Sequence, residues 1–473
     1  MKNKNLFVLS ITALLTLTSC GGKNNNKPVE GLTDLEKSNM EVEFNEITNT
    51  CMVENEVKAY VDAMEEQEKT LEKPYHFSSL YGPTDYARMA DKADTDDANK
   101  DYASTDTGGV DSCQYLGKNG KDGNVPIVVS WDANGLDYED AKIKFWSTED
   151  HSDVREASVT VDSNGVASAK LANLYRATKY RIQLFDNGDV SQGFEFETAD
   201  YPRTISMGDV PNVRDIGGYM TSYGVRTTQG IIYRGFEIED KSGGHGVKYN
   251  EKCEAVNQEV MKIGYEIDLR ASTELNGRTA SALQGCDNYQ CLTLVSYENF
   301  LKESSYRNLP AIFEILANAD QEHVYFHCWG GADRTGMLAF FINAICGVSY
   351  TDLLEDFEIT SETNNKRCHM HNSSSAHFPK FLNAFFAWDG YDADKTINEN
   401  CYSWLKDVAN VSEENMLKVR QLMIPGYDDN MPQNIPTYTP SSETQEDQYG
   451  TWNPAVEDAN VKCNYQRKDE ARA

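Results

Sequence analysis

A thiol and a guanidinium stand six positions apart in the stretch HCWGGADRTG, residues 327–336. The thiolate of a cysteine is a strong nucleophile, and the planar fork of an arginine matches two oxygens of a phosphoryl group. Gly330 and Gly331 lie between Cys328 and Arg334, where they allow the backbone to close around an anion. No other cysteine in the sequence has an arginine six positions further on. The spacing therefore predicts a loop that binds an oxyanion next to a nucleophilic sulfur.

The elements on either side of this stretch must position it. Residues 323–327 are β-branched and aromatic, which predicts a strand, and residues 337–342 are apolar, which predicts a buried helix. At the start of a helix the backbone N–H groups lack intrahelical partners and the dipole favours negative charge, so the thiolate of Cys328 is favoured there. We expect Thr335 to donate its hydroxyl to the Cys328 sulfur. The alternative is a structural cysteine ahead of a core helix, which the polar, glycine-rich neighbours disfavour.

With His327, Thr335 and the glycines included, the stretch resembles the signature loop of cysteine-dependent phosphatases. Its ending, Asp-Arg-Thr-Gly, resembles the bacterial tyrosine phosphatases that are related to the dual- and triple-specificity lipid and protein phosphatases. Three more motifs of that family stand in family order before the loop, at residues 210–219, 231–235 and 263–270. The resemblance implies an α/β cysteine-phosphatase fold, with a mostly parallel central sheet flanked by helices.

The resemblance also implies roles for the residues. Cys328 would attack phosphorus, Arg334 would hold the oxygens, and a carboxylic acid would protonate the leaving group. Asp333 is the first candidate for that acid, and Glu298, thirty positions before the cysteine, is the second. The residues expected to bind phosphate are Trp329, Gly330, Gly331, Ala332, Asp333, Arg334 and Thr335. Those expected to support the loop, mainly through ion pairs, are His327, Arg214, Asp215, Asp268 and Arg270.

One departure from the family bears on the substrate. Ala332 stands where family members that act on lipids usually carry lysine. Without that cation we expect phosphotyrosine, with phosphoserine and phosphothreonine as further substrates. The alternative enzyme is a phosphoinositide or inositol polyphosphate phosphatase, since cysteine-type phytases share the His-Cys-x5-Arg-Thr core. A catalytically silent surface binding protein is the alternative outside enzymes. We expect no cofactor and no metal, because no Cys-x2-Cys spacing indicates a zinc site.

The N-terminus has the pattern of an exported lipoprotein. Two lysines precede the apolar residues 6–17, which are too few to span a bilayer. The following Leu17-Thr18-Ser19-Cys20 resembles a bacterial lipobox, so we expect a signal peptide over residues 1–19 and a lipid on Cys20. The alternative is an ordinary secretory signal. The protein would then be lipid-anchored to the bacterial cell envelope, on its periplasmic or surface side.

The charge of the chain limits its partners. The net charge of −31 excludes nucleic acid, whose phosphates would be repelled, and restricts membrane contact to the lipid anchor. A phosphorylated protein or a small phosphate ester can still bind, because distant surface charge is screened within about 8 Å at physiological salt.

The rest of the chain divides by composition. Residues 20–120 predict a tether, a short helix and an acidic linker, and residues 426–473 predict an acidic tail. Residues 121–200 alternate apolar and polar positions between Asn-Gly turns, which indicates an all-β sandwich of the immunoglobulin or fibronectin kind. Within it, residues 174–180 resemble the tyrosine corner of fibronectin type III modules. We expect this module to act as a spacer for the catalytic domain, residues 201–425.

Cys286 and Cys291 are close enough in sequence to pair in an oxidising compartment.

Overall fold

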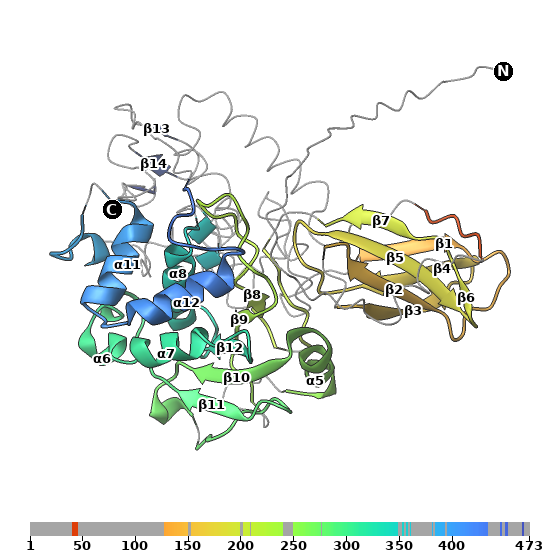
Figure 1. Ribbon diagram of the computed structural model, residues 1–473. Coiled ribbons are helices and arrows are strands. Elements are labelled where there is room, and N and C mark those ends of the chain that lie inside the picture. Colours follow the sequence, from red (N-terminus) through yellow and green to blue (C-terminus); the bar gives the residue numbers. More distant parts are fainter. Residues whose placement is uncertain are drawn as a thin grey trace.

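The computed structural model shows a curled β-sheet beside a larger α/β unit (Figure 1). The residues that it describes are 40–45, 127–149, 153–198, 202–208, 210–239, 249–275, 277–348 and 395–433, with parts of 352–360 and 381–392 and three short strands between residues 445 and 467. The signal peptide, Cys20 and the short helix expected before residue 71 lie outside them. Among the described helices, none combines the length and the apolar character needed to cross a bilayer.

The predicted antiparallel sheet is confirmed. Its strand order is β1-β4-β3-β2-β5-β6, with β7 also on β5, and every pairing is antiparallel. The strands are β1 (Ile127–Asp132), β2 (Lys142–Ser147), β3 (Arg155–Val161), β4 (Val166–Leu171), β5 (Lys179–Asp186), β6 (Asp189–Val190) and β7 (Phe194–Glu197). The first part of β3 pairs with β2 and its last part with β4, so the sheet curls around its own core. The predicted turns at Asn134, Asn187 and Gly165 have positive φ.

Residues 40–45 pair with this sheet through isolated bridges, a contact that the predicted tether, short helix and acidic linker of residues 20–120 did not include. Phe44 pairs with Trp131 in an antiparallel bridge, and Val42 is buried. The side chain of Gln192 donates to the Val42 carbonyl and accepts from the Val42 N–H. The alternation Met-x-Val-x-Phe over residues 40–44 is the strand pattern that could have predicted this segment.

The α/β unit is built on a second sheet, in the order β11-β10-β12-β9-β8. The strands are β8 (Arg214–Asp215), β9 (Ile232–Gly235), β10 (Ile263–Asp268), β11 (Asn288–Cys291) and β12 (His323–His327). All neighbours are parallel except β8, which runs antiparallel to β9. The predicted mostly parallel central sheet is therefore confirmed, with the strand that leads into Cys328 at its centre.

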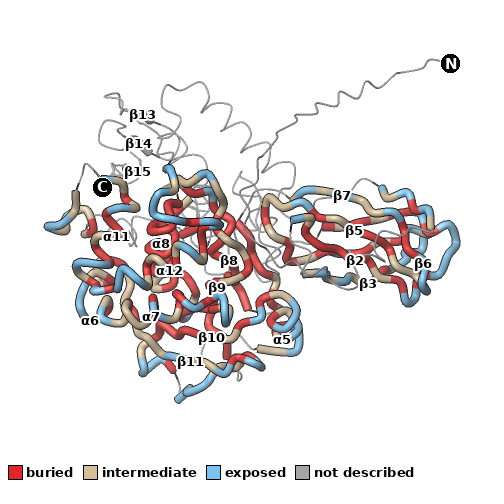
Figure 2. Tube along the Cα trace, viewed as in Figure 1, coloured by how far each residue is buried: buried red, intermediate tan, exposed pale blue. Residues whose placement is uncertain are grey.

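Helices cover this sheet, and one of them lies in the hydrophobic core of the α/β unit. They are α5 (Glu251–Val256), the π-helix η3 (Asn257–Met261), α6 (Glu303–Tyr306), α7 (Leu309–Leu316), α8 (Asp333–Ile345), α11 (Ile397–Asp407) and α12 (Glu413–Met423). From Thr335 to Ile345 every residue of α8 is buried, and Figure 2 shows buried residues along α8 and the strands beside it. Thr396 and Ser412 cap α11 and α12, as a capping residue accepts from N–H groups of the first turn.

The predicted pairing of Cys286 with Cys291 is wrong, because both cysteines are free. The Cys286 thiol donates to the Asn288 carbonyl, and the Cys291 thiol donates to the Arg270 carbonyl. Proximity in sequence does not bring the two sulfurs together, since β11 extends the chain between them.

Candidate active site

The loop of residues 328–332 joins β12 to α8, as its sequence predicts. Cys328 is only 3% exposed, immediately after the end of β12. Gly331 has φ +65°, and a Cβ added there would lie 2.3 Å from the Gly235 carbonyl oxygen. Only glycine fits this position, because the loop packs directly against the end of β9.

Three carbonyl oxygens of the loop accept hydrogen bonds from the surrounding protein. The Trp329 carbonyl accepts from the Glu237 N–H at 3.1 Å, the Gly330 carbonyl accepts from Asn212 Nδ2 at 3.0 Å, and the Gly331 carbonyl accepts from Arg234 Nη2 at 2.9 Å. In a trans peptide the next N–H points opposite to the carbonyl. The N–H groups that follow these three carbonyls therefore point away from these donors.

Arg334 lies beside the sulfur. Burial alone would lower the pKa of its guanidinium, but hydrogen bonds to Glu274 and the nearby Cys328 sulfur outweigh burial and raise the pKa above its usual range. Nη1 donates to one oxygen of Glu274 at 2.6 Å, and Nη2 donates to the other at 3.0 Å. A guanidinium has five N–H donors, so three are left for the Cys328 sulfur and an anion once Glu274 has taken two. The structure therefore brings the thiol and the arginine together, as their spacing predicts.

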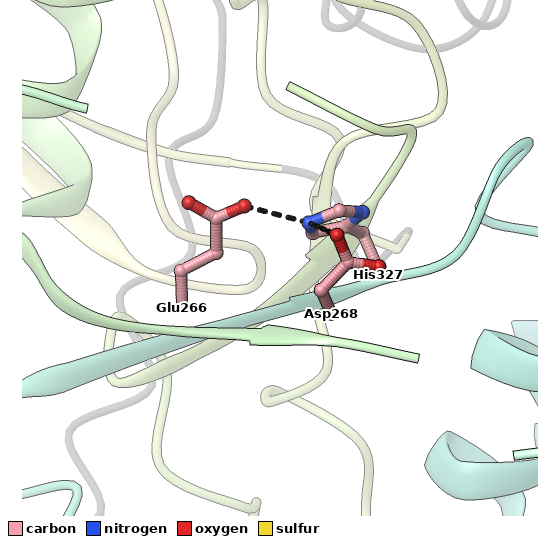
Figure 3. Close-up of side chains that lie close together, drawn as sticks. All are labelled: Glu266, Asp268 and His327. Atoms are coloured by element: carbon pink, nitrogen blue, oxygen red, sulfur yellow. Dashed lines mark hydrogen bonds and ion pairs between the residues drawn. The ribbon is translucent and has the colours of Figure 1, made fainter. Parts of the chain in front are cut away.

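His327 supports the loop from beneath. Its Nε2 lies 2.7 Å from Glu266 Oε1 (Figure 3). Its Nδ1 lies 2.9 Å from the Cys328 carbonyl oxygen. Both ring nitrogens lie within hydrogen-bond distance of oxygen atoms, so the imidazole is held from two sides. Asp268 Oδ2 lies 3.9 Å from Nε2 and adds negative charge beside the ring.

Glu266, Asp268 and His327 lie close enough together to hold a metal ion. Their oxygens, however, already accept hydrogen bonds from protein donors. Glu266 accepts from Arg278 and Ser281, while Asp268 accepts from the Arg270 guanidinium and from the Tyr289 hydroxyl at 3.0 Å. We therefore interpret the cluster as an ion-pair network that fixes the carboxyl ends of β10 and β12.

A second buried network holds the outer side of the loop. Arg214 Nε donates to Asp356 Oδ1 at 3.1 Å, and Arg234 Nη1 donates to Asp356 Oδ2. Burial would raise the pKa of Asp356, but the two guanidinium groups outweigh burial and lower it. Burial, with Arg214 beside it, lowers the pKa of Arg234 to about 10. Because Arg234 also donates to the Gly331 carbonyl, this network fixes the shape of the loop.

The remaining two residues expected to support the loop act at a greater distance. Arg270 is buried and donates to Glu237 and Glu239, both at 2.6 Å. Glu237 in turn holds the Trp329 carbonyl through its backbone. Asp215 faces away from the loop: it accepts from Arg203 at 2.7 Å, and from the N–H groups of Gly217 and Gly230.

The two candidate acids come from neighbouring segments. The Tyr297 hydroxyl donates to Asp333 Oδ1, at the first residue of α8. Glu298 follows Tyr297 in the short 3-10 helix η5 (Tyr297–Asn299) and is half-buried. Tyr297 has φ +58°, a left-handed conformation that is uncommon for a large side chain. The fold thus brings the segment that carries Glu298 to the start of α8. The spacing of Glu298 from Cys328 did not identify Tyr297 as part of the site.

One expected contact is not formed. Thr335 Oγ1 is buried and has no hydrogen-bond partner among the described residues, so the predicted bond to the Cys328 sulfur is absent. Arg334 is the group that lies beside that sulfur instead.

The fold and the loop together define an α/β protein with a buried cysteine beside an arginine, in the loop that follows its central strand. A sequence model described as the tyrosine phosphatase family matches residues 205–430. This segment includes all the strands of the second sheet and every residue of the site just described. No curated protein matches the chain. The family match supports a phosphatase function and phosphorylated substrates.

The ion-pair network beneath the loop predicts how stability depends on pH. Burial would raise the pKa of Asp268, but His327 and Arg270 outweigh burial and lower it to about 2. A carboxylate whose pKa is lower in the folded state stabilises the fold above its unfolded pKa, about 3.9, and loses that effect as pH falls toward 2. We expect an Asp268→Asn variant to be less stable than wild type at pH 7, and the gap to narrow by on the order of 2 kcal/mol toward pH 2. Urea unfolding across this range measures it, and a constant gap would contradict the assignment.

Proposed function

We propose that the protein is a phosphatase of the cell envelope, held there by a lipid on Cys20, that hydrolyses phosphate monoesters through a phosphocysteine intermediate. Phosphotyrosine is the foremost substrate, with phosphoserine and phosphothreonine as further substrates. One observation carries the proposal: the Cys328 sulfur lies beside the Arg334 guanidinium, in a loop whose carbonyl oxygens are bound on the outside.

The reaction has two steps. Cys328 Sγ attacks phosphorus, the bond from phosphorus to the ester oxygen breaks, and that oxygen takes a proton from a carboxylic acid. Arg334 and the loop N–H groups stabilise the charge on the three remaining oxygens. Water then attacks phosphorus, the carboxylate takes the proton from the water, and the S–P bond breaks to release phosphate and restore the thiolate.

The lining of the loop favours substrates with a single phosphate. Ala332 is buried and supplies no charge where a lysine would bind a second phosphate. The net charge of −31 also disfavours crowded anions such as inositol polyphosphates. These two features favour a phosphorylated protein over the inositol polyphosphate alternative.

The N-terminal sheet is proposed to be a fibronectin-like module. The Tyr175 N–H donates to the Tyr180 hydroxyl at 2.9 Å, which is the kind of hydrogen bond that a tyrosine corner forms. The bend of β3 from β2 to β4 is also consistent with two packed layers.

The direct test is turnover of p-nitrophenyl phosphate by the wild-type protein in the presence of a chelator. We expect metal-independent turnover that vanadate inhibits, because vanadate resembles the transferred phosphoryl group. Turnover that the chelator abolishes and an added divalent metal restores would contradict a phosphocysteine mechanism.

We propose Asp333 as the acid, because the Tyr297 hydroxyl fixes one of its oxygens at the start of α8. An Asp333→Asn variant should lose about 10²-fold to 10³-fold in kcat and the basic limb of its pH profile. The loss should be larger with phenyl phosphate than with p-nitrophenyl phosphate, whose leaving group needs less protonation. Glu298→Gln is the matched control, and we expect it to retain kcat within a factor of about three. The opposite pattern would assign the acid to Glu298.

A further inference from the structure

A buried arginine connects the curled sheet to the catalytic unit. Arg203 lies between the two, and its side chain is only 1% exposed. It donates to the sheet through Nη2 to the Asn173 carbonyl at 2.9 Å and through Nε to the Leu174 carbonyl at 3.2 Å. Its guanidinium also stacks on the Tyr175 ring, 4.2 Å from the centroid. On the other side it donates to Asp215 in β8 at 2.7 Å.

β8 carries this connection on toward the loop. Neighbouring residues of a strand point to opposite faces, so Asp215 faces Arg203 while Arg214 faces the catalytic core. Arg214 binds Asp356, which also binds Arg234, the donor to the Gly331 carbonyl. Two residues before Arg214, the Asn212 side chain donates to the Gly330 carbonyl. Arg203 therefore binds β8, and residues in and next to β8 support the loop through the contacts just described.

The rest of this contact is tightly packed. The Gln229 side chain accepts from the Arg176 N–H at 2.9 Å and donates to the Arg176 carbonyl at 3.2 Å. The Arg176 guanidinium stacks on Tyr219 at 4.7 Å. A Cβ on Gly230 would lie 2.7 Å from the Tyr175 hydroxyl. Contacts this close fix the sheet against the catalytic unit, whereas a spacer needs only a flexible connection.

We propose that the curled sheet is a positioning module of the active site, and that Arg203 is the residue through which its docking fixes β8 and the phosphate-binding loop. This inference rests on the proposed phosphatase function and replaces a spacer with a part of the catalytic unit. The loop N–H groups must face the phosphoryl oxygens closely, and a displacement of about 1 Å at such a site can cost about 10²-fold in rate. A shift of β8 moves Asn212 and Arg214 together, so it alters two supports of the loop at once.

The test uses the full-length protein and begins with wild-type turnover of p-nitrophenyl phosphate. Arg203→Met should lower kcat about tenfold to 10²-fold while KM changes less than about threefold, since the loop binds the transition state more tightly than the ground state. Vanadate affinity should fall by a similar factor. Arg203→Lys should recover part of the loss, because an ammonium still pairs with Asp215. Arg181→Met is the matched control: Arg181 is an arginine of the same sheet that pairs with Glu195 at the surface.

A second variant guards against misfolding, because removing one partner of a buried ion pair leaves the other charge buried and unpaired. Gln229→Ala leaves Arg203 and Asp215 intact and only loosens the contact with Arg176. It should lower kcat about threefold to tenfold, in the same direction as Arg203→Met. If Gln229→Ala and folded Arg203→Met both keep wild-type kcat and vanadate affinity, the sheet is passive and the inference is overturned. If the wild type itself shows no turnover, the proposed function fails instead.

Discussion

A Cys328→Ser variant is expected to lose at least about 10⁴-fold in kcat toward p-nitrophenyl phosphate. The serine hydroxyl is nearly isosteric with the thiol but is not ionised at neutral pH, so no nucleophile remains. The groups proposed to bind phosphate should be unchanged, because Arg334 stays paired with Glu274 and the loop carbonyls keep their donors. The variant should therefore still bind vanadate or inorganic phosphate, which calorimetry measures directly.

Cys291→Ser is the matched control for this variant. Cys291 is a free, half-buried cysteine at the end of β11, and its thiol donates to a backbone carbonyl that a hydroxyl can also reach. We expect its kcat to stay within a factor of about two of wild type. A Cys328→Ser protein that kept more than a tenth of wild-type turnover would mean that another group attacks phosphorus.

The sequence predicted the parts of the site that are contiguous in the chain. Strand, loop and helix follow one another within residues 323–345, so their order and their glycines specify the turn without help from the rest of the fold. The positive φ at Gly331, beside the end of β9, is a case in which residue type alone indicated the geometry.

The residues that hold the loop could not be predicted in the same way. Asn212, Arg234 and Asp356 lie far from Cys328 in sequence and meet only when β8 and β9 line up beside β12. Buried charged residues in strands are the signal that was available, since a charge is rarely buried without a partner. Which charges would pair depended on the register of the sheet, which a single sequence does not specify.

The curled sheet shows the same limit at a larger scale. Its alternation was readable, but the segment of residues 40–45 is separated from β1 by more than eighty positions. The contact that carries the further inference joins Arg203 to carbonyls of the sheet. The residue types in a sequence do not show which backbone carbonyls accept hydrogen bonds from distant side chains. The sequence therefore predicted only a spacer.

Arg334→Lys should lower kcat/KM by about 10³-fold, because each lost donor to a developing oxyanion costs about 10²-fold to 10³-fold. A lysine keeps the charge but lacks the fork that binds Glu274 with two nitrogens and leaves further donors for phosphate. KM should rise as well as kcat fall, since the fork contacts the phosphoryl group in both ground and transition states. Steady-state kinetics separate the two effects. A lysine variant with wild-type kcat/KM would show that charge alone suffices.

Glu274 fixes the orientation of the Arg334 guanidinium, and the contribution of Glu274 to turnover should depend on pH. The hydrogen bond from Arg334, together with others, lowers the pKa of this carboxyl below its usual range. A carboxylate with a lowered pKa keeps its partner fixed at neutral pH and loses it only as pH falls through that lowered value. As far as this group is concerned, wild type should therefore hold its turnover at any pH above the ordinary pKa of a glutamate, about 4.3, and lose it only below that pH. Glu274→Gln should lose about tenfold already at pH 7, because a neutral amide accepts from a guanidinium more weakly and with a single oxygen. The ratio of wild-type to variant turnover should then shrink below about pH 4. If this ratio stays constant with pH, Glu274 does not control the orientation of Arg334. The phosphate of the substrate alone would then orient the arginine.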